Sequence, residues 1–431
     1  MLASIIGFVV AFALIFFRMP IALALALVGV GGYAAMTGWN PAFVMLANSV
    51  RDSSMTYGLS VIPLFILMGN VIAGSGVSAD LFRAAQRMLG HRRGGLAMAA
   101  LFSCAGFAAV SGSSVATAVT MGKASLPSMR HYKYDPSFSA ATLAAGATLG
   151  ILVPPSIVMV VYGIITETHI GKLYAAGLLP GALAVLLYAL AIRWAVWRND
   201  GIAPAAELAT LAQKLEALKG VWAVVVLFVF VLGGIYAGIF TAAEAAGAGA
   251  GGALLISLIK RNMSREVLLD ILRDTAEMTA IIFAILLGAY AFTEFLNLTG
   301  VHTSLLTLIT GYKLPPLAVI FVIVLIYVVL GCIMESMSMV LITVPIFFPV
   351  VTGLGFDPVW FGVIVVVVVE LGLITPPLGV NLFAIRLIAS DVPMGSLIRA
   401  VVPFIAVDLV RVTLLVLFPV ITLYLPNLFF K

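Results

Sequence analysis

Two short polar interruptions within otherwise apolar segments carry the side chains best suited to bind a cation. The first is Ser111-Gly112-Ser113-Ser114, and the second runs from Gly331 to Ser338 and contains Glu335, Ser336 and Ser338. Hydroxyl and carboxylate oxygens are ligands that hard cations prefer. Each interruption is therefore a candidate half of an ion-binding site.

A pair of adjacent prolines follows each interruption, at Pro154-Pro155 and at Pro376-Pro377. A proline pair removes two N–H donors and leaves preceding carbonyls without partners. In lipid those carbonyls must find another partner. We expect an ion to be that partner, with freed carbonyls between Gly150 and Pro154 facing the serine hydroxyls of the first interruption.

The candidate residues fall on two sides of one expected site. On the first side the predicted sodium ligands are Ser111, Ser113, Ser114, Gly150 and Pro154. On the second side they are Glu335, Ser336, Ser338, Thr375, Pro376, Gly379 and Asn381. Half-helices that begin after the interruptions would point N–H groups at the same region and stabilise a carboxylate there. The predicted substrate contacts are Ser113, Ser156, Ser336 and Asn381.

A single serine-rich segment or proline kink in a membrane helix is more often a packing feature than a binding site. Two copies that each combine a kink with an interrupted segment favour binding.

The composition places these residues in a membrane. Of the 431 residues, 63% are hydrophobic and only 10% are charged, and the mean hydropathy is +1.20. These values exclude a water-soluble globule. We expect an all-α integral membrane protein with about ten spans, each of roughly 20 residues, plus two pieces too short or too broken to span. The N-terminal apolar run lacks the features of a cleaved signal and is expected to be the first span.

The chain matches itself at a shift of about 222 residues. Asp135-Pro136 pairs with Asp357-Pro358, and Leu149-Gly150 and Pro154-Pro155 pair with Leu371-Gly372 and Pro376-Pro377. The sequence therefore predicts two related halves of about five spans each. We expect the first repeat at 1–200 with a hairpin at about 95–130, a cytoplasmic linker at 201–220, and the second repeat at 221–431 with a hairpin at about 314–352.

The basic residues indicate the orientation. With the N-terminus outside and five crossings before residue 200, most of the 23 lysines and arginines fall on the cytoplasmic side, as the positive-inside rule requires. Because five is odd, the second half is inverted and both termini are periplasmic. Each hairpin is re-entrant, and the two enter from opposite faces. The net charge of +5 reflects these loop residues, and no nucleic-acid partner is expected.

Six charged residues fall in apolar surroundings, where burial is costly and a functional role is the first hypothesis. They are Glu244, Glu294, Glu335, Glu370, Asp408 and Arg411. Asp408 and Arg411 stand three residues apart, so we expect them to pair with each other. Glu335 lies at the second interruption and is placed near the ion or substrate site. Cys104 and Cys332 form no metal or redox spacing and are expected to be packing residues.

These segments resemble the large membrane subunit of tripartite ATP-independent periplasmic (TRAP) transporters, of the ion-transporter superfamily. The most specific similarities are Ser111-Gly-Ser-Ser-Val-Ala-Thr117, Gly150-Ile-Leu-Val-Pro-Pro-Ser156, Gly372-Leu-Ile-Thr-Pro-Pro-Leu-Gly-Val-Asn381 and Val61-Ile-Pro-Leu-Phe-Ile-Leu-Met-Gly69. The resemblance covers nearly the whole chain. It implies a bacterial inner-membrane protein in which an elevator domain carrying both hairpins slides against a scaffold, driven by the sodium gradient.

The resemblance also implies two protein partners, a small four-helix membrane subunit and a periplasmic protein that delivers the substrate. The small subunit is not expected to be fused to this chain. Besides membrane lipid, the expected ligands are a small carboxylate and Na⁺ as the coupling ion, with no other cofactor. C4-dicarboxylates, sialic acid and keto acids all remain open as substrates.

Two other classes of function stay open. A stand-alone sodium-dependent carboxylate carrier, or a sodium/proton antiporter of the same superfamily, would share the repeats and hairpins without a periplasmic partner. An intramembrane enzyme is the less favoured class, because His91, His131, His169 and His302 show no ligand spacing and no hydrolytic dyad stands out.

Overall fold

The computed structural model describes residues 2–260 and 263–430, and within them the chain forms helices and no strands. The all-α expectation is confirmed. The first half contains α1 (Leu2–Phe16), α2 (Ile21–Thr37), α3 (Trp39–Met55), η1 (Tyr57–Ser60), α4 (Val61–Gly74), α5 (Val77–Leu89), α6 (Gly95–Ser111), α7 (Ser114–His131), α8 (Pro136–Thr148), η2 (Leu149–Ile151), α9 (Ile157–Ile165) and α10 (Ile170–Arg198).

The second half begins after an extended connection. It contains α11 (Leu211–Tyr236), α12 (Ala242–Ile259), α13 (Arg265–Thr299), α14 (Val301–Gly311), α15 (Pro316–Gly331), α16 (Ser336–Gly353), α17 (Pro358–Gly372), α18 (Val380–Ile388), α19 (Met394–Leu417) and α20 (Val420–Phe429).

Seven helical stretches among the described residues are long and apolar enough to cross a membrane. They are Tyr57–Gly74, Ile170–Arg198, Leu211–Tyr236, Ala242–Ile259, Arg265–Thr299, Ser336–Gly353 and Met394–Leu417. Seven further apolar helices have 10–17 residues. The number of full-length spans is smaller than the ten expected, because several expected spans are divided into shorter helices.

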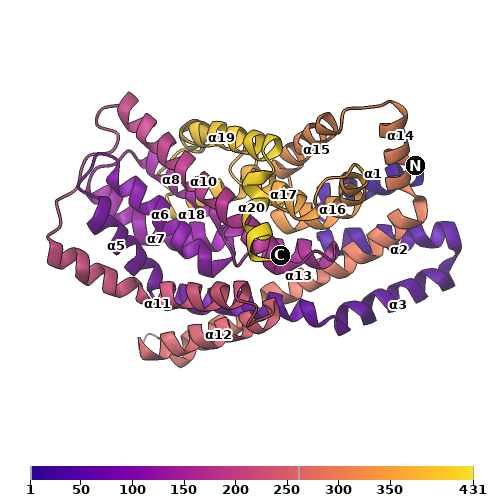
Figure 1. Ribbon diagram of the computed structural model, residues 1–431, viewed down its shortest axis with the longest axis horizontal. Helices are drawn as coiled ribbons and strands as arrows, with labels where there is room; N and C mark the ends of the chain where they lie inside the picture. Colours follow the sequence, from indigo (N-terminus) through magenta and orange to yellow (C-terminus); the bar gives the residue numbers. More distant parts are fainter. Residues whose placement is uncertain (1, 261–262, 431) are drawn as a thin grey trace.

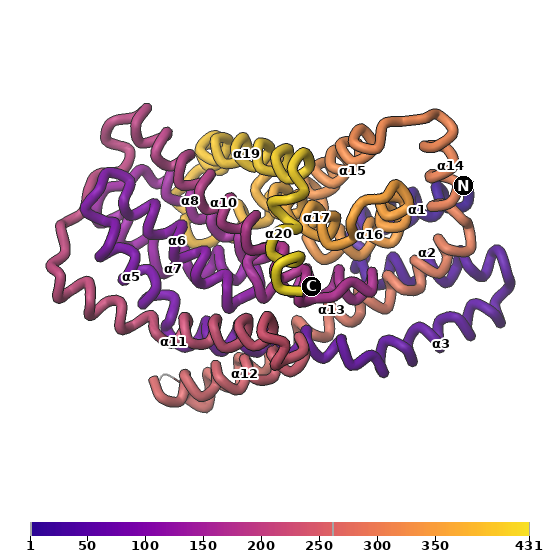
Figure 2. The backbone as a smooth tube through the Cα atoms, viewed as in Figure 1, coloured from indigo at the N-terminus to yellow at the C-terminus, as the bar shows by residue number. Residues whose placement is uncertain are grey.

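The helices pack in two groups (Figures 1 and 2). In the first group α13 lies along α2 and α4, and α12 packs on α4. In the second group α8 contacts α6, α7, α18 and α19, while α17 contacts α15 and α16. Helix α10 packs on α19 and α20 and so holds the ends of the two halves together. The interrupted segments and the proline pairs all belong to the second group.

Equivalent caps start the helices before the two proline pairs. Asp135 Oδ1 accepts a hydrogen bond from Phe138 N over 2.8 Å at the start of α8, and Asp357 Oδ1 accepts one from Val359 N over 2.7 Å at the start of α17. In both helices proline follows the capping aspartate, because its fixed φ suits the first helical position and its missing donor is not needed there. The Asp-Pro step therefore sets where each helix begins.

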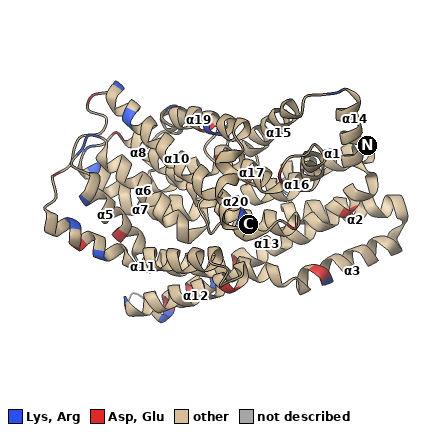
Figure 3. Ribbon diagram, in the orientation of Figure 1, with Lys and Arg blue, Asp and Glu red and all other residues tan. Residues whose placement is uncertain are grey.

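The connection between the halves is tied to neighbouring loops. Helix α11 starts at Leu211, inside the range expected as linker, with Thr210 and Gln213 forming a capping box. Gly94 N donates to Ala203 O over 3.0 Å, and Asp135 N donates to Ile202 O over 2.9 Å. The connection thus packs against the loops that precede α6 and α8. Charged side chains gather on this part of the molecule, near α5, α11 and α12 (Figure 3).

Candidate ion and substrate site

The first interruption is a break between two helices. Helix α6 ends at Ser111, Gly112 adopts a left-handed φ of 61°, and α7 begins at Ser114. Glycine takes this φ without the steric cost of a side chain. The Ser113 hydroxyl accepts a hydrogen bond from Ala116 N over 3.3 Å and caps α7, while Ser111 Oγ and Thr117 Oγ1 lie 2.8 Å apart. The serines are therefore gathered around one helix start.

The segment before the first proline pair packs directly on this break. A methyl group placed on Gly150 would lie 2.6 Å from Ser113 O, and one on Gly112 would lie 2.9 Å from Pro155 O. Both contacts involve backbone oxygen, so only glycine permits the approach. The structure therefore brings Ser111, Ser113 and Ser114 together with Gly150.

Gly69 of α4 also belongs to this contact. A methyl group placed there would lie 2.8 Å from Ser111 O. Sequence reasoning singled out the segment that ends at Gly69 but gave this residue no role. The sequence feature that indicates this contact is Gly69 itself, because it follows a run of large apolar side chains.

The second interruption has the same form. Helix α15 ends at Gly331 and α16 begins at Ser336, with Glu335 as its capping residue. Glu335 Oε2 accepts hydrogen bonds from Met337 N over 3.0 Å and from Ser338 N over 3.3 Å. A carboxylate at a helix N-terminus is stabilised by the unpaired N–H groups there. Glu335 therefore brings a negative charge to the break while it caps α16.

The second proline pair also packs on its interruption. A methyl group placed on Gly372, where α17 ends, would lie 2.6 Å from Gly331 Cα. Leu378 N, just after the prolines, donates to Cys332 O over 3.3 Å. Thr375 Oγ1 donates to Leu371 O over 2.6 Å, so its hydroxyl proton is already engaged. Both proline pairs are cis.

Asn381 joins the second proline segment to the first half of the chain. Its side chain is fully buried, and its Nδ2 donates to Ala144 O of α8 over 3.3 Å. Its Oδ1 has no hydrogen-bond partner among the described residues. A buried amide oxygen without a partner is costly, and it is a suitable ligand for a hard cation.

The helix that follows each break packs against a helix from the other half of the chain. Helix α7, after the first break, packs on α18, which follows the second proline pair. Helix α16, after the second break, packs on α9, which follows the first proline pair. Each break is therefore enclosed by parts of both halves.

The predicted substrate residues differ in what their side chains do. Ser156 is fully buried, donates to Ile151 O and accepts from Met159 N over 3.3 Å. Its hydroxyl is fully used as a helix cap. Ser336 stands at the start of α16, where backbone N–H groups are available to an anion. Of the predicted set, Ser156 is thus the residue least free to contact a ligand.

The expected burial of the charged residues is correct for three of six. Glu370, Asp408 and Arg411 are fully or almost fully buried. The side chains of Glu244 and Glu294 instead reach the surface of the chain, so their expected burial is wrong, while Glu335 lies in the break where it caps α16. Glu244 forms a capping box with Thr241. The expected Asp408–Arg411 pair is present at 2.9 Å, but Arg411 also pairs with Glu370 at 2.8 Å.

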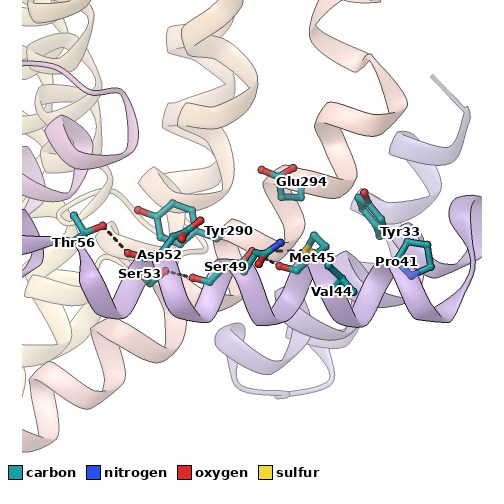
Figure 4. A pocket seen from close by; sticks show the side chains of 11 residues that line it. Tyr33, Pro41, Val44, Met45, Ser49, Asp52, Ser53, Thr56, Tyr290 and Glu294 are labelled. Carbon is teal, nitrogen blue, oxygen red and sulfur yellow. Dashed lines mark hydrogen bonds between the residues drawn. The ribbon is translucent and has the colours of Figure 1, made fainter.

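A surface hollow of about 520 Å³ lies elsewhere, between α2, α3 and α13 (Figure 4). Tyr290 and Glu294 of α13 face Asp52 and Ser49 of α3 across it. None of the predicted ion or substrate residues lines this hollow.

Comparison with known proteins decides the family. The model of the family described as "Tripartite ATP-independent periplasmic transporter, DctM component" matches residues 8–421. The chain belongs to this family. The resemblance inferred from the sequence motifs is thereby confirmed, and the chain is the large membrane component of a TRAP transporter.

Relatives of this TRAP permease include proteins with assigned substrates. It is 37% identical over 384 residues, 89% of each chain, to the C4-dicarboxylate TRAP transporter large permease protein DctM of Pseudomonas aeruginosa. It is 34% identical to the C4-dicarboxylate permease DctM of Rhodobacter capsulatus, over 99% of each chain. It is 29% identical to the sialic acid permease SiaM of Vibrio cholerae, over 100% of this chain and 99% of that one. These relatives are transporter permeases rather than enzymes.

A solved structure shares the fold. The YdaH transporter of Alcanivorax borkumensis matches with a TM-score of 0.61 over 89% of each chain, at 16% sequence identity. At this identity the likeness concerns the fold alone, that of a multi-span helical membrane protein.

Proposed function

We propose that this TRAP permease carries out secondary active uptake of a small organic carboxylate, coupled to the sodium gradient. The observation that carries the proposal is the pair of helix breaks, each packed through a glycine against a proline segment, at Gly150 and at Gly372. Each break combines backbone carbonyls and hydroxyls, and the second side adds the oxygens of Glu335 and Asn381. Such oxygen sets suit a hard cation.

In the proposal, the two halves are inverted repeats and α6–α7 and α15–α16 are re-entrant hairpins. The starts of α7 and α16 would then offer N–H groups at the same depth, where an anionic substrate is stabilised next to the cations. Sodium would be held by Ser111, Ser113, Ser114, Gly150 and Pro154 on one side and by Glu335, Ser336, Ser338, Thr375, Pro376, Gly379 and Asn381 on the other. Ser113, Ser336 and Asn381 would reach the substrate.

The packing of the helices supports an elevator mechanism. The group containing both breaks would move as one transport domain against a scaffold formed by α2, α4, α12 and α13. When a rigid group moves over a large distance, its binding residues must stay together. The contacts of α9 with α16 and of α18 with α7 would hold the two breaks together.

We further propose that the chain lies in the bacterial inner membrane with both termini in the periplasm. It would work with a small four-helix membrane subunit and a periplasmic binding protein that delivers the carboxylate. Two of the relatives are named for C4-dicarboxylates, so this class is the first to test.

Uptake into proteoliposomes tests the proposal. The chain is reconstituted with its small subunit, and radiolabelled carboxylates are supplied with the binding protein under an inward sodium gradient. We expect accumulation only when the gradient and all three components are present. Accumulation by the large chain alone would favour the alternative, a stand-alone carrier, and accumulation driven equally well without sodium would refute sodium coupling.

A further inference from the structure

Five buried side chains form a closed ring where the two halves of the chain meet. Glu370 Oε1 lies 2.9 Å from Thr148 Oγ1, which lies 3.2 Å from Tyr188 Oη, which lies 2.5 Å from Asp408 Oδ2. Arg411 Nη2 closes the ring, at 2.9 Å from Asp408 Oδ1 and 2.8 Å from Glu370 Oε2. Each of these residues is at most 1% exposed.

The charges in this ring do not balance. Two ionised carboxylates and one guanidinium leave one net negative charge in a site that has no exposed surface beyond 1% of any side chain. An unbalanced charge at such a site has a desolvation cost that no partner offsets. One additional positive charge would make the ring neutral.

The oxygen contacts in the ring outnumber the hydrogens of its two hydroxyl groups. Three oxygen–oxygen contacts lead from Glu370 through Thr148 and Tyr188 to Asp408, and they are 2.9, 3.2 and 2.5 Å long. The two hydroxyls supply two hydrogens, and ionised carboxylates supply none. The Thr148 hydroxyl additionally lies 2.7 Å from Ala145 O, which can only accept. A proton on either carboxyl group would add a third donor to these contacts.

The five side chains of the ring come from four helices. Thr148 comes from α8, Tyr188 from α10, Glu370 from α17, and Asp408 and Arg411 from α19. The Phe404 ring packs against Tyr188 at 5.7 Å. Within residues 2–260 and 263–430, no further charged side chain forms an ion pair with these five.

We propose that this ring is a proton-binding site that holds one proton, shared between Glu370 and Asp408. The two carboxyl groups act as one coupled pair that takes up a single proton. The bound proton neutralises the ring, and none of the five ring residues is among the proposed sodium ligands. Because the folded chain holds a proton that exposed carboxylates release, its stability falls as the pH rises and the proton is lost.

The test compares thermal unfolding of the purified whole complex across a pH series. The variants are Glu370→Gln, Asp408→Asn and the double variant, with Glu294→Gln as the matched control on an exposed glutamate. Glutamine at position 370 can accept from Arg411 and donate to Thr148, so it mimics the protonated acid. We expect both single variants to fold and to lose the decline in melting temperature that the parent and Glu294→Gln show as the pH rises above about 4, where exposed carboxyl groups ionise.

The double variant leaves Arg411 without a carboxylate and should lose its folded state. Infrared spectroscopy gives a second readout, since the carbonyl band of a protonated carboxylic acid should be present in the parent and absent in both single variants. A band that persists in both, a parallel pH profile in parent and variants, or failure of both single variants to fold would overturn the proposal.

Discussion

Thr148 and Glu370, which are in hydrogen-bond contact at 2.9 Å, stand 222 positions apart in the chain. This is the offset that relates Pro154-Pro155 to Pro376-Pro377. If a two-fold axis relates the two halves, residues at equivalent positions can touch only near that axis. The contact therefore marks the place where an axis between the halves would pass, six residues before each proline pair.

Replacing Thr148 by valine should destabilise the protein by about 1–3 kcal/mol, because buried partners in the ring then lose a hydrogen bond. Thr142 is the matched control, since it lies on the same helix, is equally buried, and its hydroxyl has no partner among the described residues. Thr142→Val should be neutral or stabilising. Thermal unfolding of the two variants in detergent measures the difference, and equal losses would refute the role given to Thr148.

Gly150→Ala should impair folding or sodium-driven uptake, because the added methyl group would meet Ser113 O at 2.6 Å. A forced backbone shift of this kind costs about 1–3 kcal/mol. Gly372→Ala should behave alike, since its methyl group would meet Gly331 Cα at 2.6 Å. Gly251 of α12 has no atom within 4 Å of such a methyl group, so Gly251→Ala should be harmless. Wild-type uptake by Gly150→Ala would show that the close packing at the break is dispensable.

Asn381→Ala should raise the sodium concentration needed for half-maximal uptake by about tenfold, which corresponds to a loss of about 1.4 kcal/mol of binding free energy. The reason is the loss of a buried amide oxygen that has no protein partner. Asn297→Ala, on the exposed face of α13, serves as control. Sodium titration of uptake by the reconstituted complex provides the measurement. An unchanged sodium requirement would remove Asn381 from the ion site.

The parts of the fold set by local chemistry were predictable from the sequence. Asp-Pro steps fix the starts of α8 and α17, and Ser113 and Glu335 lie at helix starts because their side chains can cap exposed N–H groups. Both interruptions are therefore breaks between helices, at Gly112 and between Gly331 and Ser336.

The parts set by long-range packing were not predictable. Tyr188 and Thr148 look like ordinary residues of an apolar helix, and only the folded chain brings them to Glu370 and Asp408. The pairing of Arg411 with Asp408 followed from their spacing, but its second partner, Glu370, lies on another helix. The exposure of Glu244 and Glu294 was missed because hydropathy does not distinguish a buried face of an apolar helix from an outer one.

The opposite orientation of the two halves is the claim on which the proposed site depends most. Arg92 lies between α5 and α6, Lys313 occupies the matching place between α14 and α15, and both side chains are exposed. The Arg92→Cys and Lys313→Cys variants are treated in right-side-out vesicles with a maleimide that cannot cross the membrane. The parent chain, treated in the same way, measures the background labelling of Cys104 and Cys332. The account predicts that Lys313→Cys reacts in intact vesicles and that Arg92→Cys reacts only after permeabilisation. Labelling of both variants from the same side would contradict it.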